Sequence, residues 1–369
     1  MSISGYATAE GTDRYRERLA TKVGKDHFRQ GACLTLSSIG IGTYLGELDD
    51  QTDKLVSQAV FESVRGGINL IDTAINYRAE RAEKSIAKAL AKLIESGDFA
   101  RDEIVLCSKG GYLPEPTNPV AWFEKEYVKN KEYEIKKTDL AAGIHCLHPS
   151  YLYHQLECSL ANLGVDCIDV YYVHNPETQL SEIEPKLFQE RLFKAFEVLE
   201  AATSQGKIKS YGLATWNALR TPAGTKEHID LFAVKELAKE AAGSREDHFH
   251  YVQLPFNLAM MEALMATQQS GDEAVPVLEA ARLLGLQVVS SASICQAQII
   301  GQIPDPLSQG LGQGLSDAQR GLQFTRSSPG FISALVGMKQ PEHVEENLAL
   351  AAIAPLAAEE YISMLNVSS

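Results

Sequence analysis

Eight short apolar runs follow one another along the chain, and each is followed by a longer segment whose apolar residues recur at helical spacing. The runs predicted as strands are 38–42, 69–72, 104–108, 168–173, 209–213, 251–254, 287–290 and 331–336. The segments predicted as helices are 53–65, 83–94, 149–163, 187–204, 232–242, 275–284, 317–326 and 342–351, with a last helical stretch that ends at Leu365. This alternation is typical of parallel strands joined by helices.

The predicted strands are apolar on both faces, as in a parallel sheet that is covered on both sides. We therefore predict an α/β fold, a single-domain (β/α)8 TIM barrel over residues 31–369. Residues 1–30 are a polar N-terminal extension that packs on the barrel or frays from it. The alternative is an open doubly wound sheet, which would carry a G-x-G-x-x-G turn after its first strand. The sequence has no such turn there.

Two loops are longer than such units normally need. The insertion 111–143 is rich in Pro, Lys, Glu and aromatic residues and leaves from the third predicted strand. The segment 304–314 follows the seventh strand and is rich in Gly and Pro. Each is either surface decoration or functional, the first as a wall of the substrate site and the second as a lid over a cofactor. The aromatic residues of the insertion are Tyr112, Trp122, Phe123, Tyr127 and Tyr133.

The overall charge limits the class of partner. The formal net charge is -14 over 369 residues. Nucleic acids and anionic membranes need concentrated Lys and Arg, so neither is expected as a partner. The negative net charge does not exclude a local basic pocket for a phosphorylated cofactor. The oligomeric state is left open by the sequence.

The six cysteines are scattered without a C-x-x-C pair. We interpret them as reduced thiols, with a structural zinc site as the alternative. The first residues contain no apolar stretch of the kind found in secretory signals, and no run approaches about 18 apolar residues. These features predict a cytoplasmic protein.

Three of the predicted strands end on an ionisable residue, namely Asp72, Lys109 and His174, and Tyr77 follows the first of them. In a parallel barrel the carboxyl ends of the strands meet at one mouth, so these side chains are expected to lie together. A neighbouring ammonium lowers the pKa of a phenol, which is ordinarily near 10, and a carboxylate holds that ammonium in place. A histidine close by can orient a reacting oxygen. The set suits proton transfer at a carbonyl oxygen.

With these motifs the chain resembles the aldo-keto reductase superfamily over about residues 33–352. The main segments are Gly42-Thr-Tyr-Leu-Gly46, Gly67-x-Asn-x-x-Asp72-Thr-Ala-x-x-Tyr77, Ser108-Lys109 and Tyr172-Val-His174. The supporting segments are Lys207-Ile-Lys-Ser-Tyr-Gly212, Val252-Gln253-x-x-x-Asn257 and Gly337-Met-Lys-Gln-Pro-Glu-His-Val-Glu-Glu-Asn347.

The resemblance implies a (β/α)8 oxidoreductase that transfers hydride between NADPH, or NADH, and a carbonyl without a metal. Tyr77 would be the general acid, Lys109 and Asp72 the pair that lowers its pKa, and His174 the residue that orients the carbonyl. Gln253 would lie under the nicotinamide, while Asn257 is expected to be structural. The full set of implied cofactor-binding residues is Gly42, Thr43, Tyr44, Asp72, Thr215, Gln253, Ser291, Lys339, His343 and Asn347.

Three cofactor positions depart from the family's pattern. Where the family usually has Ser-Asn after the fifth strand, this chain has Ala214 and Thr215. Where many members have Tyr-Ser-Pro-Leu, residues 291–294 read Ser-Ala-Ser-Ile, without an aromatic ring to stack on the nicotinamide. An arginine common in one branch is His343, which leaves Lys339 to meet the 2′-phosphate of NADPH. These departures leave open both the affinity for the cofactor and the choice of NADPH over NADH.

Two other functions fit parts of the sequence. Lys109 could form a Schiff base, as in an aldolase on the same barrel, although Tyr77 and the segment 337–347 would then have no role. Alternatively, the chain could be a catalytically weak subunit that binds NADP(H) and senses redox state. The altered residues Ala214 and Ser291 and the insertion motivate that second hypothesis.

Overall fold

Eight parallel strands close into a barrel in the computed structural model, which describes residues 2–31, 33–243, 245–270 and 273–367. The last barrel strand pairs with the first and completes the ring. In chain order the strands are β3 (Ile39–Gly42), β4 (Leu70–Asp72), β5 (Val105–Gly110), β8 (Ile168–His174), β9 (Ile208–Ala214), β10 (Phe249–Pro255), β13 (Gln287–Ser291) and β14 (Phe331–Gly337). The predicted (β/α)8 barrel is confirmed, and each predicted strand overlaps one of these.

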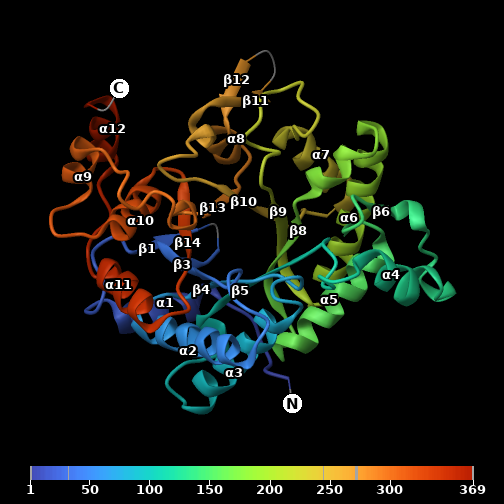
Figure 1. Ribbon diagram of the computed structural model, residues 1–369, viewed down its shortest axis with the longest axis horizontal. Helices are drawn as coiled ribbons and strands as arrows, with labels where there is room; N and C mark the ends of the chain where they lie inside the picture. Colours follow the sequence, from blue (N-terminus) through green and yellow to red (C-terminus); the bar gives the residue numbers. More distant parts are fainter. Residues whose placement is uncertain (1, 32, 244, 271–272, 368–369) are drawn as a thin grey trace.

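Helices surround the barrel in chain order, from α2 and α3 in blue to α10 and α11 in orange and red (Figure 1). They are α2 (Asp50–Gly66), α3 (Arg81–Glu95), α5 (Pro149–Leu163), α6 (Pro185–Ser204), α7 (Leu231–Ala242), α8 (Val277–Leu283), α10 (Asp317–Ser327) and α11 (Pro341–Ala351). The C-terminal helix α12 (Ala358–Val367) packs beside α10. Each overlaps a predicted helix, because amphipathic spacing is a strong signal over lengths of this kind.

Successive side chains of a strand point to opposite faces, and the barrel strands divide their residues between two cores accordingly. In β5, Val105 and Cys107 cluster with Leu70 of β4, whereas Leu106 packs against the helices. The cluster that contains Leu70, Val105 and Cys107 comes from the barrel strands, apart from Ala7, Leu34 and Leu36. It contains no residue of the surrounding helices, so it fills the barrel interior.

The N-terminal segment packs on the barrel. It contains α1 (Ala9–Leu19) and β1 (Phe28–Gln30), which pairs antiparallel with β2 (Thr35–Ser37). Tyr15 is fully buried and donates to the carbonyl of Val64, 2.5 Å away. Helix α1 was not predicted, because two of its four buried residues are Gly11 and Thr12, which leave no apolar periodicity.

Two further elements differ from the prediction. An antiparallel pair, β11 (Ala266–Ser270) and β12 (Glu273–Pro276), precedes α8, so the helix predicted over 275–284 begins at Val277. In the segment 304–314, residues 305–311 form the short helix α9 (Asp305–Leu311), which packs against α10 and α12.

The insertion after β5 has a small core of its own. It extends past the predicted boundary at residue 143 to Cys146, because β6 (Leu140–Ala141) pairs with β7 (His145–Cys146). It also contains α4 (Pro119–Phe123). The rings of Phe123 and Tyr127 are buried, and Trp122 packs against them. Most of the aromatic residues that characterise this segment therefore stabilise the insertion itself. No helix among the described residues is long and apolar enough to cross a bilayer.

Gly67 caps the C-terminal end of α2, three residues before β4, the strand that carries Asp72, and has φ +115°. A Cβ atom there would lie 2.6 Å from Cγ1 of Val23. We expect Gly67→Ala to lower the free energy of unfolding by about 1–3 kcal/mol, measured by urea denaturation. Gly97 is the matched control, because its φ is also positive (+75°) but its surroundings leave room for a Cβ. A loss at Gly67 no larger than the loss at Gly97 would contradict the steric argument.

Candidate active site

The carboxyl ends of three neighbouring strands bring Asp72, Lys109 and His174 to the same mouth of the barrel. Asp72 and His174 are the last residues of β4 and β8, and Lys109 lies one residue before the end of β5. Asp72 is two positions after Leu70, so it shares the inward face of its strand; Lys109, four positions after Val105, does likewise. The backbone alone therefore directs these side chains toward each other.

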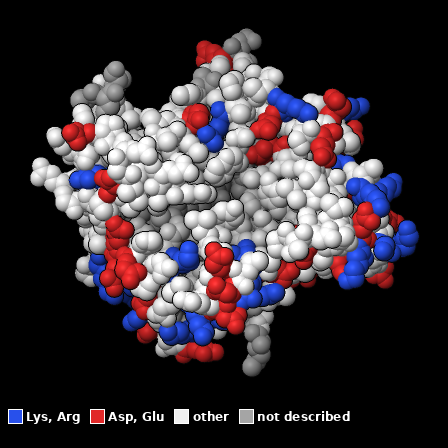
Figure 2. Space-filling view, in the orientation of Figure 1, with Lys and Arg blue, Asp and Glu red and all other residues white. Residues whose placement is uncertain are grey.

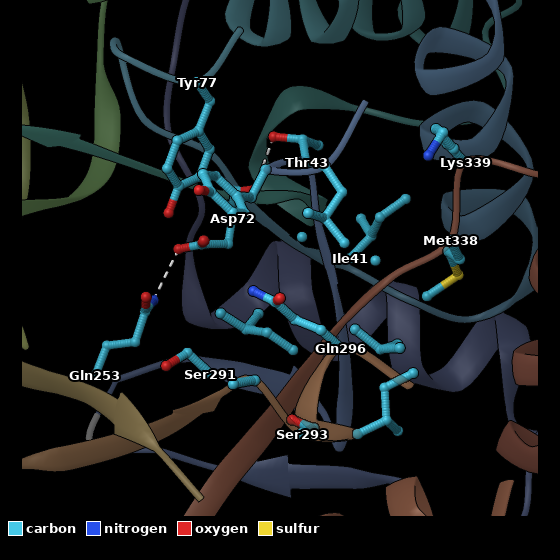
Figure 3. Close-up of a pocket in the computed structure, with 18 of the residues that line it drawn as sticks. Ile41, Thr43, Asp72, Tyr77, Gln253, Ser291, Ser293, Gln296, Met338 and Lys339 are labelled. Atoms are coloured by element: carbon cyan, nitrogen blue, oxygen red, sulfur yellow. Dashed lines mark hydrogen bonds between the residues drawn. The ribbon is translucent and has the colours of Figure 1, made fainter. Parts of the chain in front are cut away.

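Lys109 is the centre of this group and is fully buried. Its Nζ donates to Asp72 Oδ2 at 2.5 Å and to the carbonyl oxygen of Thr73 at 2.9 Å. The same Nζ lies 3.2 Å from the Tyr77 hydroxyl, to which it donates. Gln253 Nε2 donates to the other Asp72 oxygen at 2.8 Å (Figure 3). The structure thus brings Asp72, Lys109 and Tyr77 into direct contact, and Gln253 is connected to them through Asp72.

The Lys109 side chain is held as an ammonium. Burial lowers the pKa of this amine, but the charge and hydrogen bond of Asp72, together with Tyr77, raise it more, so that the pKa lies above its ordinary value. A protonated amine is not a nucleophile. The geometry suits Lys109 for stabilising negative charge on the Tyr77 oxygen.

The Tyr77 phenol has a raised pKa, contrary to the lowered value expected from the sequence. Burial disfavours the phenolate, and this effect exceeds the stabilisation that Lys109 provides. Tyr77 is therefore protonated at neutral pH and can donate its proton. Lys109 reduces the cost of the phenolate that remains after that donation.

His174 is neutral. Burial, with the nearby positive charge of Lys109 as the second cause, lowers its pKa well below the ordinary value. Its ring lies edge-on to Tyr77 with centroids 5.7 Å apart. Its Nδ1 is buried without a hydrogen-bond partner among the described residues. A neutral imidazole beside the phenol can hold a carbonyl oxygen without competing as an acid.

A cavity of about 680 Å³ starts at these residues and extends to Lys339 and His343. In Figure 2 the face toward the viewer is hollowed near its middle, and mostly uncharged side chains surround the hollow. Of the ten residues implied as cofactor-binding, nine line this cavity: Gly42, Thr43, Tyr44, Asp72, Thr215, Gln253, Ser291, Lys339 and His343.

Asn347 is the exception. Its side chain is buried on α11, and its Nδ2 lies 3.8 Å from the sulfur of Met338. Met338, not Asn347, contributes to the cavity wall. Asn347, which the resemblance implied as a cofactor-binding residue, is therefore separated from the cavity by Met338 in this structure.

Polar groups at both ends of the cavity fit a dinucleotide. Thr215 Oγ1 is buried and has no partner in the described part of the chain, so it is free to bind a carboxamide. At the opposite end, no acidic side chain within the described ranges pairs with Lys339, whose charge is available for a phosphate. Ala214, which ends β9, has no side-chain hydrogen-bonding group to add.

The loop after β13 occupies the place expected for a stacking ring. Ser291 lies at the cavity wall, and the Gln296 carboxamide is directed into the cavity (Figure 3). Ala292, Gln296 and Ala297 have positive φ values of 51°, 51° and 68°, unusual for residues other than glycine. Sequence reasoning missed Gln296, since nothing in its local pattern indicates a side chain turned inward.

Other cavity residues could have been found from the sequence. Asn175 directly follows His174, and Trp216 comes two residues after the end of β9. The strand-end rule that located Lys109 applies to both. From the insertion, Tyr112 alone lines the cavity, and none of the residues 304–314 does. Of the insertion expected to form a wall of the substrate site, one residue thus does so. The segment 304–314, expected as a lid over the cofactor, does not line the cavity.

The loop that carries Trp216 is fixed by Glu177. One oxygen of this buried carboxylate accepts hydrogen bonds from the backbone amides of Trp216, Asn217 and Ala218, at 2.6, 2.9 and 3.4 Å. Burial raises the pKa of Glu177, although these amides favour its ionised form. Trp216 itself is 40% exposed at the cavity rim.

No group of three or more His, Cys, Asp or Glu side chains that could hold a metal ion occurs among the described residues. The six cysteines are free, and Cys33 is the exposed one.

Comparisons with known proteins agree with the geometry. The sequence profile described as "Aldo/keto reductase family" matches residues 38–235. An NADH-specific methylglyoxal reductase of Escherichia coli (strain K12) is 29% identical over 195 residues, and the match spans only half of that relative's length and 50% of this chain. A 6-dehydroglucose reductase of Novosphingobium aromaticivorans is 24% identical over 318 residues, which cover 85% of this chain and 86% of the relative.

Solved structures share the fold. An aldo/keto reductase from Klebsiella pneumoniae, in complex with NADP and acetate, superposes with a TM-score of 0.60 at 20% identity, covering 93% of this chain and 95% of that one. An aldo-keto reductase from Bacillus halodurans in its holo form gives 0.61 at 18% identity, covering 94% and 96%.

Histidine titration tests the electrostatics of the site. We expect the ring signals of His174 to stay at their neutral positions as the pH falls from 8 to 6, because burial and Lys109 keep its pKa well below 6.5. The measurement is an NMR titration of histidine-labelled protein, with the His174 signals assigned by their absence in His174→Gln. A midpoint near 6.5 for these signals would contradict a neutral His174.

Proposed function

The chain belongs to the aldo/keto reductase family, and on this premise we propose that it reduces an aldehyde or ketone to an alcohol with a nicotinamide cofactor and Tyr77 as the general acid. The observation that carries the proposal is the position of Lys109 Nζ between Asp72 and Tyr77, at 2.5 Å and 3.2 Å. This arrangement makes loss of a proton from Tyr77 less costly inside a buried site, which is what proton donation to a carbonyl oxygen requires.

The cofactor would lie along the cavity. Thr215, Gln253 and Ser291 would hold its nicotinamide end beside the catalytic residues, and Lys339 and His343 its phosphate-bearing end. When bound, the reduced nicotinamide supplies the hydride. NADPH is the proposed cofactor because Lys339 is free to bind a 2′-phosphate, and NADH remains the alternative.

Side chains of the protein supply the proton that the reduction needs. Tyr77 gives its hydroxyl proton to the carbonyl oxygen as hydride reaches the carbonyl carbon, which yields the alcohol and a phenolate. Lys109 stabilises that phenolate, and Asp72 keeps Lys109 charged and in place. The phenolate is protonated again from solvent. His174, neutral and edge-on to Tyr77, donates a hydrogen bond that orients the carbonyl oxygen between them.

The substrate is a small uncharged carbonyl compound. The catalytic end of the cavity is lined by rings and amides, from Tyr44, Asn76, Tyr112, Asn175 and Trp216. Beyond the paired Asp72, no charged side chain of the described residues lines this end. A carboxylate on the substrate would find no partner there. The names of the two curated relatives, which denote methylglyoxal and 6-dehydroglucose reduction, are in keeping with small neutral carbonyls.

The alternatives from the sequence are less well supported. A Schiff-base aldolase needs a neutral amine, whereas Asp72 holds Lys109 as an ammonium. A catalytically weak NADP(H)-binding subunit would not need four interacting residues at the mouth.

Replacing the general acid tests the mechanism. We expect Tyr77→Phe to lower turnover by about 10²–10⁴-fold, the usual contribution of a positioned proton donor. Turnover is followed as NADPH consumption at 340 nm with a panel of aldehydes and ketones. NADPH affinity, measured by fluorescence titration, should change little because the ring is kept. Turnover within twofold of the parent protein would exclude Tyr77 as the acid.

Lys339 tests the choice of cofactor. We expect Lys339→Ala to weaken NADPH binding by about 10–100-fold, the value of a hydrogen bond to a charged group, and to leave NADH binding unchanged. NADH serves as the internal control, since it lacks the 2′-phosphate. Equal weakening of both cofactors would mean that Lys339 contacts a different part of the dinucleotide.

A further inference from the structure

The insertion after β5 leaves and rejoins the barrel beside His174. Its first residues and its last strand are joined by a hydrogen bond from the Cys146 amide to the Gly111 carbonyl, 2.9 Å long. Tyr112 forms a bridge with His145. Although most of the insertion packs on itself, these two ends lie against the catalytic histidine.

His145 contacts the backbone of His174. Its Nε2 lies 2.7 Å from the His174 carbonyl oxygen, and its Nδ1 lies 2.9 Å from Gln179 Nε2. Arg191, which can only donate, lies 2.5 Å from Gln179 Oε1. The Gln179 amide is therefore oriented with its NH2 toward His145, and Nδ1 of His145 must accept. The proton of His145 is on Nε2 and is donated to the His174 carbonyl.

This hydrogen bond persists over a wide pH range. His145 is fully buried, and burial lowers its pKa to about 4, so the ring stays neutral above that value. The close approach requires glycine at position 111, where φ is +132° and an added Cβ would lie 2.7 Å from His145 Nε2.

Tyr112 packs against the ring of His174. Its own ring packs edge-on against those of His145 and His174, with centroids 5.0 and 5.1 Å away and nearly perpendicular planes. Its hydroxyl lies 2.8 Å from Thr178 Oγ1, which fixes the phenol. Movement of the His174 ring toward Tyr112 would therefore be opposed by this contact.

We propose that His145 and Tyr112 are positioning residues for catalysis, and that the insertion serves to hold both the backbone and the ring of His174 beside Tyr77. The proposal rests on the proposed carbonyl reduction. Reaction rates fall steeply when a reacting group moves by about 1 Å, so a small shift of His174 affects turnover more than binding. Neither residue transfers a proton itself.

His145→Leu removes the donor and keeps an apolar side chain of similar volume, while His145→Gln places an amide nitrogen where Nε2 was. We expect kcat of His145→Leu to fall by about 10–100-fold with the NADPH affinity unchanged. His145→Gln should recover most of the loss. Arg191→Met is a milder variant at a partly exposed residue, and it should lower kcat several-fold by releasing Gln179.

His27 provides the matched control. It is also fully buried, its pKa is likewise lowered to about 4 by burial, and its Nε2 lies 2.9 Å from the carbonyl oxygen of Gly67. It is not among the residues that line the cavity. His27→Leu should lower stability as His145→Leu does. It should leave kcat within about twofold, since the partners of its ring, Gly67 and Ser38, do not line the cavity.

A kcat for His145→Leu as high as that of His27→Leu would overturn the proposal, and so would a His145→Gln variant no better than His145→Leu. If His145→Leu does not fold, an unchanged kcat in Arg191→Met overturns it. The NMR signals of the His174 ring give a readout that does not need activity: they should shift in His145→Leu and not in His27→Leu. Absence of NADPH consumption by the parent protein would instead count against the proposed function.

Discussion

The buried ion pair between Lys109 and Asp72 is the interaction on which the candidate site depends. An ammonium with no exposed surface is tolerated only when a carboxylate and further acceptors replace its water, and Asp72 and the Thr73 carbonyl do so. Asp72 in turn is satisfied by Gln253 from the far side of the barrel. The two buried charges, on Lys109 and Asp72, are thus paired at one place in the barrel interior. The phenol of Tyr77 lies next to that point and gains its chemical role from it.

Strand geometry explains how much of this could be predicted. The side chains of a strand alternate in direction and parallel strands end together, so Asp72, Lys109 and His174 had to meet once the barrel was recognised. Their grouping does not depend on the details of packing. The pKa of Tyr77 does depend on those details, because burial and a neighbouring charge act in opposite directions and only the structure decides which is larger.

Other features were beyond a reading of the sequence for similar reasons. Asn347 lies on a helix, and the rotation of α11 that turns it toward Met338 is set by packing. The aromatic residues around Tyr127 looked like a ligand wall, but they form a core within the insertion. Helix α1 escaped notice because Gly11 replaces an apolar side chain where Asp102 approaches closely. In each case a contact distant in sequence decides the outcome.

The way Glu177 holds the rim of the cavity has a consequence for how this barrel could acquire new substrates. Within the described residues, its carboxylate holds this loop through the backbone amides of residues 216–218, so the path of the loop does not depend on which side chain position 216 carries. A change at Trp216 would alter the shape of the entrance while leaving its framework in place. Natural or laboratory selection can therefore change substrate specificity at the entrance without disturbing the backbone that supports the catalytic residues.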